Sequence, residues 1–255
     1  MESWVPYGLS GQVAFVTGGG DGIGRATARL LAKAGSAVAV ADLRVAAAEE
    51  TASLIANDGG TAIAVELDVT RSEPCGNAAT RTQNSFGAIS IVVNSAGISV
   101  PAGVDDADLV TQLERSIAVN ATGSLNVVRA CLDQLRQTRG AVVNLASIAS
   151  FIAGNSSIAY GASKGAVAQM TKFLARDLAP SSIRVNAVAP GIVETSMTAR
   201  LRGDEARLKR ATQRTLLGRL ARPEEIAAPI VFLASPAASY ITGTILIVDG
   251  GYLAS

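Results

Sequence analysis

Histidine is absent from the 255 residues of this sequence. The absence excludes mechanisms built on imidazole, such as Ser-His-Asp catalysis, His-ligated zinc and histidine pH switches. Proton transfer must therefore use Tyr, Lys, Asp, Glu or Cys side chains. Cysteine is almost absent too, because only Cys75 and Cys131 occur and they form no C-x-x-C pair. Such cysteines usually behave as small buried hydrophobic residues, so we expect no metal site and a reducing, cytoplasmic environment.

An excess of charge of either sign is also lacking, since 22 basic residues face 21 acidic ones. No overall field draws the chain to nucleic acid or to a membrane, and neither is expected as a partner. Three uncharged stretches, 82–104, 140–163 and 226–248, are interrupted by residues such as Pro101, Asn144 and Pro229, so they predict buried strands with turns and no membrane span. Residues 1–10 lack a basic region and an apolar run, so no secretory signal is expected.

Short apolar runs alternate with longer segments of helical period. Because the runs are apolar throughout, they predict strands of a parallel sheet covered on both faces. We expect a Rossmann-like, doubly wound α/β fold of about seven strands with helices on both faces. No linker or repeat divides residues 1–255, which favours a single domain. The predicted strands are 13–17, 37–41, 62–67, 89–93, 141–145, 183–188 and 244–248, and the predicted helices are 23–34, 45–57, 72–86, 107–137, 158–178 and 224–234.

A glycine-rich turn, Thr17 to Gly24, follows the first strand and precedes the first helix. Glycines at such a turn let the backbone approach a pyrophosphate, which the helix N-terminus then stabilises. The turn therefore predicts a dinucleotide site that includes Gly18, Asp21, Gly22, Ile23 and Gly24. A tight turn without a ligand is the alternative.

An acidic residue, Asp42, ends the second strand. A carboxylate at this distance from the glycine turn can accept hydrogen bonds from an adenosine ribose, and it would repel a 2′-phosphate. Asp21 adds a second negative charge, so NAD is favoured over NADP. Arg44 is the residue that argues for NADP, since its guanidinium could bind a phosphate. Asp42 as an ordinary strand-end residue is the other alternative.

Ser147, Tyr160 and Lys164 form the strongest candidate for catalysis. On a helix, Tyr160 and Lys164 lie four positions apart and share a face, so the ammonium can stabilise a phenolate. A free tyrosine has a pKa of about 10, and a neighbouring cation lowers it. The pair is thus a plausible acid–base without histidine, although a surface Tyr/Lys pair has the same spacing.

Together these residues resemble the short-chain dehydrogenase/reductase family, in its single-domain form, from Leu9 to Gly251. The resemblance rests on motifs in the family's order: Thr17 to Gly24, Asp42, Leu67-Asp68-Val69, Asn94-Ser95-Ala96-Gly97, Asn120, Ser147, Tyr160 with Lys164, and Pro190-Gly191. The family's usual Asn-Asn-Ala-Gly is changed at Ser95, a position that in the family chiefly stabilises the central sheet. The change therefore bears on local stability more than on catalysis.

The resemblance implies a role for each matched residue. Tyr160 would be the catalytic acid/base, Lys164 would lower its pKa and bind the nicotinamide ribose, and Ser147 would hold the substrate oxygen. Asn120 would anchor a water that links Lys164 to solvent. The other positions would contact the cofactor: Asp68 and Val69 beside the adenine, Asn94, Ala96 and Gly97 along the ribose, and Pro190, Gly191, Val193 and Thr195 around the nicotinamide.

A basic segment covers Ser196–Arg222, with eight basic residues against Asp204 and Glu205. In the family, the region around 195–222 is a mobile lid over the substrate. The basic residues are either a solvated helix face or an attraction for an anionic substrate or the phosphates of an acyl carrier. The nearby run of Ile148, Ala149, Phe151, Ile152, Ala153 and Gly154, with Asn155 as its polar member, suits a hydrophobic small-molecule substrate.

Three functions remain open on the sequence. The leading one is an NAD-dependent dehydrogenase or reductase acting on a secondary alcohol or ketone by hydride transfer. The second is an NADPH-dependent 3-oxoacyl-carrier reductase, and the third is a non-catalytic nucleotide sensor on the same fold. The resemblance also implies a homotetramer that uses the helices predicted at 107–137 and 158–178, with the C-terminal strand region at a second contact, although the apolar faces of those helices suit an internal core equally well.

Overall fold

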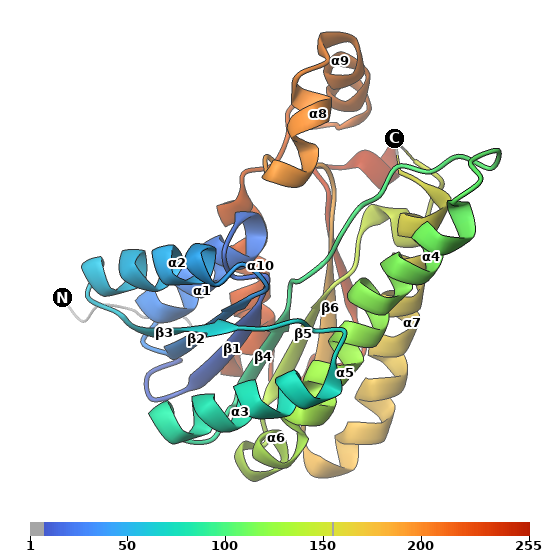
Figure 1. The fold of residues 1–255 in the computed structure, drawn as a ribbon. Helices are drawn as coiled ribbons and strands as arrows, with labels where there is room; N and C mark the ends of the chain where they lie inside the picture. The colour runs from blue at the N-terminus through green and yellow to red at the C-terminus, as the bar shows by residue number, and fades with distance from the viewer. Residues whose placement is uncertain (1–7, 155) are drawn as a thin grey trace.

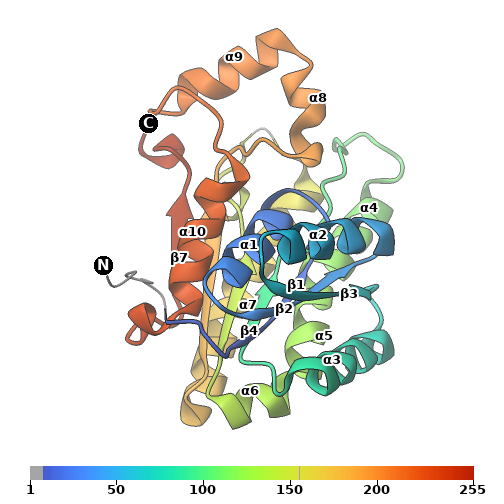
Figure 2. The same cartoon turned by 90° about the vertical axis from the view of Figure 1, so that its left-hand side faces the viewer.

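The computed structural model describes residues 8–154 and 156–255. Its strands form one parallel sheet in the order β3-β2-β1-β4-β5-β6-β7, with helices on both faces (Figures 1 and 2). The expected doubly wound α/β fold is confirmed. The bounds are β1 Val13–Thr17, β2 Ala37–Asp42, β3 Thr61–Glu66, β4 Ile91–Asn94, β5 Ala141–Leu145, β6 Arg184–Pro190 and β7 Ile245–Val248.

The apolar runs of the sequence become strands because both faces of the sheet are covered. In β1, Ala14 and Val16 join the core on one face, while Val13 and Phe15 join the core on the other. The first core lies under α1 (Gly22–Lys33), α2 (Val45–Asn57) and α10 (Pro223–Ala234). The second lies under α3 (Ser72–Phe86), α5 (Gly123–Ala130) and α7 (Ile158–Leu178). Strands buried on two sides need no polar alternation, which is the pattern in the sequence.

The prediction of one helix over 107–137 is wrong. The structure has α4 (Leu109–Ile117), a π-helical turn (Ala118–Thr122), α5, and then α6 (Leu132–Thr138) after a break at Cys131. The π turn lengthens the hydrogen-bond spacing by one residue, from four to five, so it shifts the helix face that later residues share. The hydroxyl of Ser124 donates to the Asn120 carbonyl inside this region at 2.8 Å. The hydrophobic periodicity of the sequence gives no sign of either interruption.

The basic segment forms a projection above the carboxyl ends of the strands (Figures 1 and 2). It begins with a 3-10 turn (Ser196–Thr198), continues as α8 (Ala199–Arg202) and then as α9 (Glu205–Arg214). Asp204 caps α9, since its side chain accepts a hydrogen bond from the Arg207 backbone N–H at 2.9 Å. Across the described residues, no helix combines the length and apolarity that crossing a bilayer requires.

A half-buried cation joins β6 to the end of α10. The guanidinium of Arg184 donates to the carbonyls of Leu233, Ala234 and Ser235 at 2.7, 3.2 and 3.0 Å. These carbonyls lie at the negative end of the helix dipole, where a cation is favoured. Burial lowers the pKa of Arg184, but its ordinary value is so high that the charge remains.

We expect Arg184→Met to lower the free energy of unfolding by about 2–4 kcal/mol, because several half-buried carbonyls lose a charged donor. Urea unfolding followed by circular dichroism measures the loss. Arg136→Met is the matched control, since Arg136 pairs on the surface with Asp133 at 3.2 Å and should change stability by under about 1 kcal/mol. Equal effects of the two substitutions would contradict the role given to Arg184.

Candidate active site

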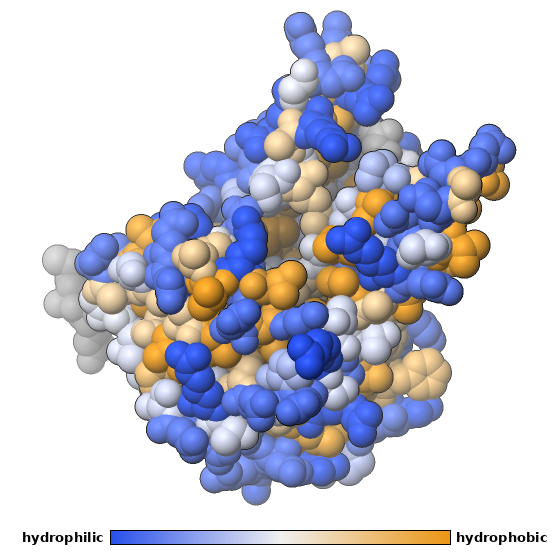
Figure 3. All heavy atoms as spheres, in the orientation of Figure 1, coloured by the Kyte–Doolittle hydropathy of each residue, from blue (hydrophilic) through white to orange (hydrophobic). Residues whose placement is uncertain are grey.

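A cavity of about 470 Å³ opens at the carboxyl ends of the strands. It lies where the strand order reverses between β1 and β4, the usual ligand position in doubly wound sheets. Figure 3 shows this face hollowed, with hydrophobic side chains inside and mostly hydrophilic ones on the projections around it. Its volume is in the range of cofactor and substrate sites.

The glycine turn forms one wall of the cavity. Gly18 has a φ of +62°, and a Cβ at this position would lie 2.8 Å from the backbone N of Ala96. A Cβ at Gly24 would collide with the Gly18 carbonyl. Glycine is therefore required at both positions for the turn to pack this closely. Gly18, Gly22, Ile23 and Gly24 all line the cavity, as the sequence predicts.

Asp21 begins α1 and also contacts the basic segment. Its Oδ1 accepts the N–H of Gly22 at 2.7 Å. Burial raises the pKa of Asp21, but hydrogen bonds from Ser196 and Gly22 and the charges of Arg25 and Arg44 outweigh it, so the pKa is lowered. Asp21 therefore carries a full negative charge in the wall of the cavity at neutral pH.

Asp42 and Asp68 line the same end of the cavity. Asp42 is only 11% exposed in its side chain, and it lies next to the strongly exposed Arg44. Asp68 accepts from the Thr70 hydroxyl at 2.7 Å and from the Thr70 N–H at 2.9 Å, and these bonds lower its pKa. With Asp21, three carboxylates line the cavity. Val69 lies beside Asp68 in the lining, as expected.

Ser147, Tyr160 and Lys164 meet at the other end of the cavity. Ser147 follows β5 and caps a 3-10 turn, because its Oγ accepts the Ala149 N–H at 3.1 Å. Tyr160 lies in the first turn of α7, which Ser157 caps. Lys164 is on the same face of α7, and its Nζ donates to the Leu145 carbonyl at 2.6 Å. The three residues predicted for catalysis are thus brought together.

The pKa of Tyr160 is not lowered, although the sequence predicts that Lys164 lowers it. Burial raises the pKa of Tyr160, a side-chain hydrogen bond with Ser147 acts in the opposite direction, and the net pKa is above its usual value. Lys164 Nζ lies 5.8 Å from the centre of the Tyr160 ring and is bonded to Leu145. Lys164 is thus not among the groups that shift the pKa of Tyr160 in this arrangement. Burial also lowers the pKa of Lys164 itself, to about 8.

Asn120 does not line the cavity, and its side chain makes hydrogen bonds that join neighbouring elements. Its amide oxygen accepts the Ile98 N–H at 2.8 Å, and its Nδ2 donates to the Ile98 carbonyl and to Ser163 Oγ. Ser163 in turn donates to the Tyr160 carbonyl at 2.8 Å. Asn120 thereby connects the loop after β4 to the catalytic turn of α7. A Cβ at Gly97 would lie 3.1 Å from Asn120 Oδ1 and 3.6 Å from Lys164 Nζ, so the glycine leaves space between them.

Asn94, expected along the cofactor ribose, does not line the cavity and instead makes hydrogen bonds within the sheet. Its Nδ2 donates to Asn144 Oδ1 at 2.9 Å and to the Ser124 carbonyl at 3.2 Å. Asn94, and not the position of Ser95, carries the side-chain bonds that join the central strands. Ser95, Ala96 and Gly97 line the cavity.

Thr17 is a positioning residue that the sequence reasoning missed. Its hydroxyl accepts the N–H groups of Ser95 and Ala96, both at 3.1 Å. The end of β1 is thereby joined to the end of β4, across the point where the strand order reverses. A threonine directly before the glycine turn, at the end of a buried strand, is the signal that could have identified it.

Pro190, Gly191, Val193 and Thr195, expected around the nicotinamide, line the cavity beyond β6. A Cβ at Gly22 would lie 2.9 Å from the Thr195 methyl, so the glycine turn and the start of the basic segment are in close contact. The Arg202 guanidinium donates a hydrogen bond to the Thr195 carbonyl at 3.0 Å. Ser196, Met197 and Thr198 complete this wall, and the sequence reasoning did not identify them.

None of the eight basic residues of the segment 196–222 lines the cavity. Five have partners elsewhere: Arg202 with the Thr195 carbonyl, Arg207 with Asp204, Arg214 over the Tyr252 ring, and Arg219 and Arg222 with Glu225. The interpretation as a solvated face therefore has more support than attraction of an anion into the cavity.

The run 148–154, expected near the substrate, does not line this cavity. Residues 148–150 form the 3-10 turn after Ser147, and Asn155 lies outside the described residues. The apolar lining comes instead from Ile98, Val119, Val193 and Met197. Arg115 of α4 is a further cavity residue that the sequence did not indicate.

The residues present fit a dinucleotide. A glycine cradle at a helix N-terminus, carboxylates at one end and a Ser/Tyr/Lys set at the other all line a single cavity. Within the described part of the chain, no group of three or more Cys, Asp and Glu residues is placed to hold a metal ion.

Comparisons with known proteins agree with this geometry. Residues 18–253 match a family model described as enoyl-(acyl carrier protein) reductase. The chain is 41% identical to cis-4-hydroxycyclohexanecarboxylate dehydrogenase of Sinomonas cyclohexanicum, over 95% of this chain and 97% of that protein. It is 37% identical to a 3-oxoacyl-[acyl-carrier-protein] reductase of Thermotoga maritima, over 95% of this chain and 98% of that protein.

Two solved structures show the same similarity. A short-chain type dehydrogenase/reductase from Mycobacterium marinum has a TM-score of 0.91 and 34% identity, and the match covers 97% of each chain. A protein described as an NAD(P)-dependent gluconate 5-dehydrogenase of Beutenbergia cavernae, with bound NADP, has a TM-score of 0.92 and 39% identity, over 98% of this chain and 100% of that one.

Proposed function

This chain belongs to the short-chain dehydrogenase/reductase family, and on that premise we propose that it oxidises hydrophobic secondary alcohols with NAD, or reduces the matching ketones with NADH. Its relatives are dehydrogenases and reductases, so it is an oxidoreductase. The observation that carries the proposal is that Ser147, Tyr160 and Lys164 share one cavity with the glycine turn and Asp42.

Tyr160 is the proposed acid/base. When bound, a nicotinamide cofactor exchanges a hydride with the substrate carbon. In alcohol oxidation the Tyr160 oxygen accepts the hydroxyl proton, and in ketone reduction it returns a proton to the carbonyl oxygen. Ser147 holds the same substrate oxygen, while Lys164 binds the nicotinamide ribose. Asn120 is proposed to anchor a water that links Lys164 to solvent, in addition to the structural bonds that it makes.

The proposed cofactor is NAD. Asp42 would accept hydrogen bonds from the adenosine ribose, and with Asp21 it would repel a 2′-phosphate. Asp68 and Val69 would flank the adenine. Ala96 and Gly97 would contact the ribose side, and Pro190, Gly191, Val193 and Thr195 would position the nicotinamide, with the pyrophosphate on Gly18, Gly22, Ile23 and Gly24.

The proposed substrate is a small molecule with a largely apolar body. Ile98, Val193 and Met197 supply apolar lining, and no basic residue of the segment 196–222 faces the cavity. A sugar would need buried partners for its hydroxyls, and few such side chains line the cavity besides those assigned to the cofactor and to catalysis. Residues 195–222 are proposed to act as the lid.

Absorbance of reduced nicotinamide tests the proposed function directly. The purified protein is mixed with NAD or NADP and a panel of aliphatic, cyclic, aryl and steroid secondary alcohols, with hydroxyacyl thioesters as a separate class. We expect NADH to appear with an apolar class of alcohols. The apolar side chains of the cavity lining can accommodate such substrates, and the carboxylates at the cofactor end favour NAD. Turnover restricted to NADP and thioesters would overturn the proposal.

The NADPH-dependent 3-oxoacyl-carrier reductase is the second candidate. The matching family model and the Thermotoga maritima relative both name an acyl carrier protein, and one similar structure contains NADP. Arg44 is exposed beside Asp42 and offers a cation to a 2′-phosphate. The same assay separates this candidate from the first, since it predicts activity with NADP and thioesters.

A homotetramer is proposed as the assembly. Apolar side chains are exposed on the elements that the family resemblance assigns to contacts: Val110 on α4, Ile158 and Phe173 on α7, and Ile247 on the edge strand β7. Light scattering that gives the mass of one chain would contradict this assembly.

The proposed location is a reducing cytoplasm. The thiols of Cys75 and Cys131 are both free and buried, which supports this location.

A further inference from the structure

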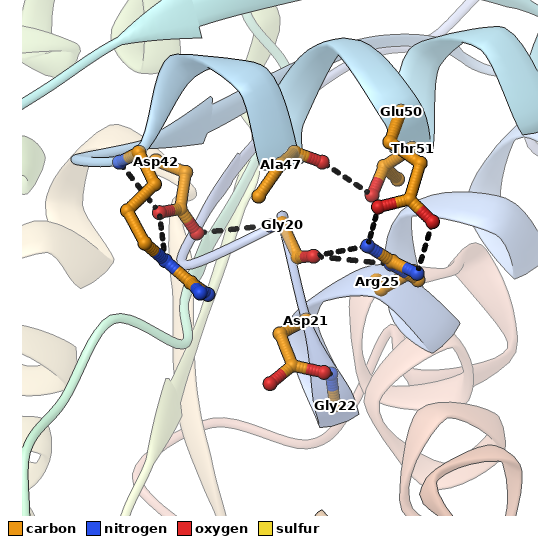
Figure 4. Close-up of polar contacts among 9 residues, drawn as sticks. Gly20, Asp21, Gly22, Arg25, Asp42, Ala47, Glu50 and Thr51 are labelled. Carbon is orange, nitrogen blue, oxygen red and sulfur yellow. Dashed lines mark hydrogen bonds and ion pairs between the residues drawn. The ribbon is translucent and has the colours of Figure 1, made fainter. Parts of the chain in front are cut away.

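Gly20 lies in the middle of the glycine turn, and both its backbone N–H and its carbonyl form hydrogen bonds to side chains (Figure 4). Its N–H donates to Asp42 Oδ2 at 3.0 Å. Its carbonyl accepts from Arg25 Nε at 3.1 Å and from Arg25 Nη2 at 2.6 Å. A Cβ on Gly20 would lie 2.7 Å from the Ala47 Cβ and 2.8 Å from Asp42 Oδ2, so the residue is packed between α2 and the carboxylate. Any shift of Gly20 must therefore move Asp42.

Arg25 is in turn held by Glu50 of α2. The two side chains make a paired contact, with Nη1 to Oε1 at 3.1 Å and Nη2 to Oε2 at 2.8 Å. Such planar, two-bond pairs fix the guanidinium in direction as well as in position. The side chain of Arg25 is 27% exposed, whereas that of Glu50 is 61% exposed. A continuous line of bonds thus runs from Glu50 through Arg25 and Gly20 to Asp42.

The orientation of Asp42 depends on two backbone donors. Gly20 N–H holds Oδ2, and Arg44 N–H holds Oδ1 at 2.9 Å. Each carboxylate oxygen keeps a further lone pair, and Asp42 lines the cavity. The Arg44 guanidinium lies 3.9 Å from Oδ1. If Oδ2 lost its donor, the carboxylate would be free to turn toward Arg44, and the charge that faces the ribose would be displaced.

We propose that Arg25 and Glu50 are positioning residues that set the preference for NAD over NADP by fixing Gly20 and, through it, Asp42. This inference rests on the proposed NAD-dependent function. Neither side chain lines the cavity, so neither is required to touch the cofactor. Their effect comes from keeping a carboxylate where it accepts ribose hydroxyls and excludes a 2′-phosphate.

The test is the ratio of the Kd values for NADPH and NADH, measured by nicotinamide fluorescence. The variant Arg25→Met/Glu50→Gln removes one charge of each sign, so the net charge is unchanged. The control Arg29→Met/Asp58→Asn removes a second α1–α2 ion pair, whose contact is 2.7 Å, without touching the turn. We expect the preference for NADH to fall about tenfold in the first variant, and by less than about twofold in the control.

The outcomes separate the inference from the function. An unchanged ratio in the folded Arg25→Met/Glu50→Gln variant, or an equal fall in the control, overturns the positioning role while the NAD assignment stands. A wild-type protein that binds NADPH as well as NADH overturns the NAD assignment and the inference with it. Glu50→Gln alone keeps the bonds from Arg25 to Gly20. It should give a smaller fall, and it supplies the test if the double variant does not fold.

Discussion

Replacing Tyr160 by phenylalanine is expected to lower the turnover number by about 10³-fold while the Kd for NADH changes by less than about twofold. The substitution removes only the phenolic oxygen, the atom proposed to exchange a proton with the substrate. The ring remains in the first turn of α7, so the wall of the cavity is kept. The proposed dinucleotide contacts lie mainly on the glycine turn and Asp42, which the substitution does not touch.

Two further variants make the Tyr160 result specific. Ser147→Ala should also reduce turnover, because it removes the second group that binds the substrate oxygen. Tyr252→Phe is the matched control, since Tyr252 is another buried tyrosine and does not line the cavity. Initial rates with the alcohol found in the substrate panel, together with fluorescence titration of NADH, measure both quantities. A Tyr160→Phe protein with full turnover would exclude Tyr160 as the acid/base and would reopen the possibility of a nucleotide sensor.

The strands and their arrangement were predictable because both faces of the sheet are buried. A strand such as β1, in which every residue is buried, cannot be an exposed hairpin strand and reads as a run without alternation. The glycine turn was equally clear, because steric contacts at Gly18 and Gly24 leave no room for a Cβ. In both cases a local physical requirement determines the types of several consecutive residues, so the sequence alone shows it.

The errors concern contacts between distant residues. The break at Cys131 and the π turn at Ala118–Thr122 leave the hydrophobic period of 107–137 almost unchanged. Asn94 turns into the sheet because Asn144 lies opposite it on β5, a pairing that local sequence does not specify. Likewise, the Leu145 carbonyl competes for Lys164, so spacing alone overstated the contact between its ammonium and the phenol of Tyr160.

Cofactor preference depends on both kinds of information. Asp42 is visible in the sequence as an acidic residue at the end of a strand. The bonds that hold it involve Gly20, Arg25 and Glu50, which come from three different elements and share no motif. Motifs therefore identify the group that contacts a ligand more readily than the groups that orient it.

Replacing Lys164 by methionine is expected to abolish most turnover and at the same time to stabilise the cofactor-free protein near pH 7. Lys164 is only 5% exposed, and burial lowers its pKa from 10.5 to about 8. Below pH 8 the side chain is charged in both the folded and the unfolded states, so folding must move a charge out of water. Methionine fills similar space without that charge, and the gain should be of order 1–3 kcal/mol after loss of the bond to Leu145.

The pH dependence distinguishes this cause from a packing effect. Between pH 8 and 10.5 the folded protein releases the proton of Lys164 while the unfolded chain keeps it, so the wild-type protein gains stability relative to the variant as pH rises. Above pH 10.5 both states are neutral and the advantage of Lys164→Met should be gone. Urea unfolding of both proteins at several pH values from 7 to about 10.5 measures the difference.

Lys172→Met is the matched control, because Lys172 is exposed on the same helix. It should change stability little, because an exposed lysine loses no water on folding. A Lys164→Met protein that is less stable than wild type at pH 7, or one whose advantage does not decline with pH, would contradict the burial of a charged lysine. The expected opposition of activity and stability follows from the proposed role of Lys164: a cation placed to bind the nicotinamide ribose must be buried even when no cofactor is bound.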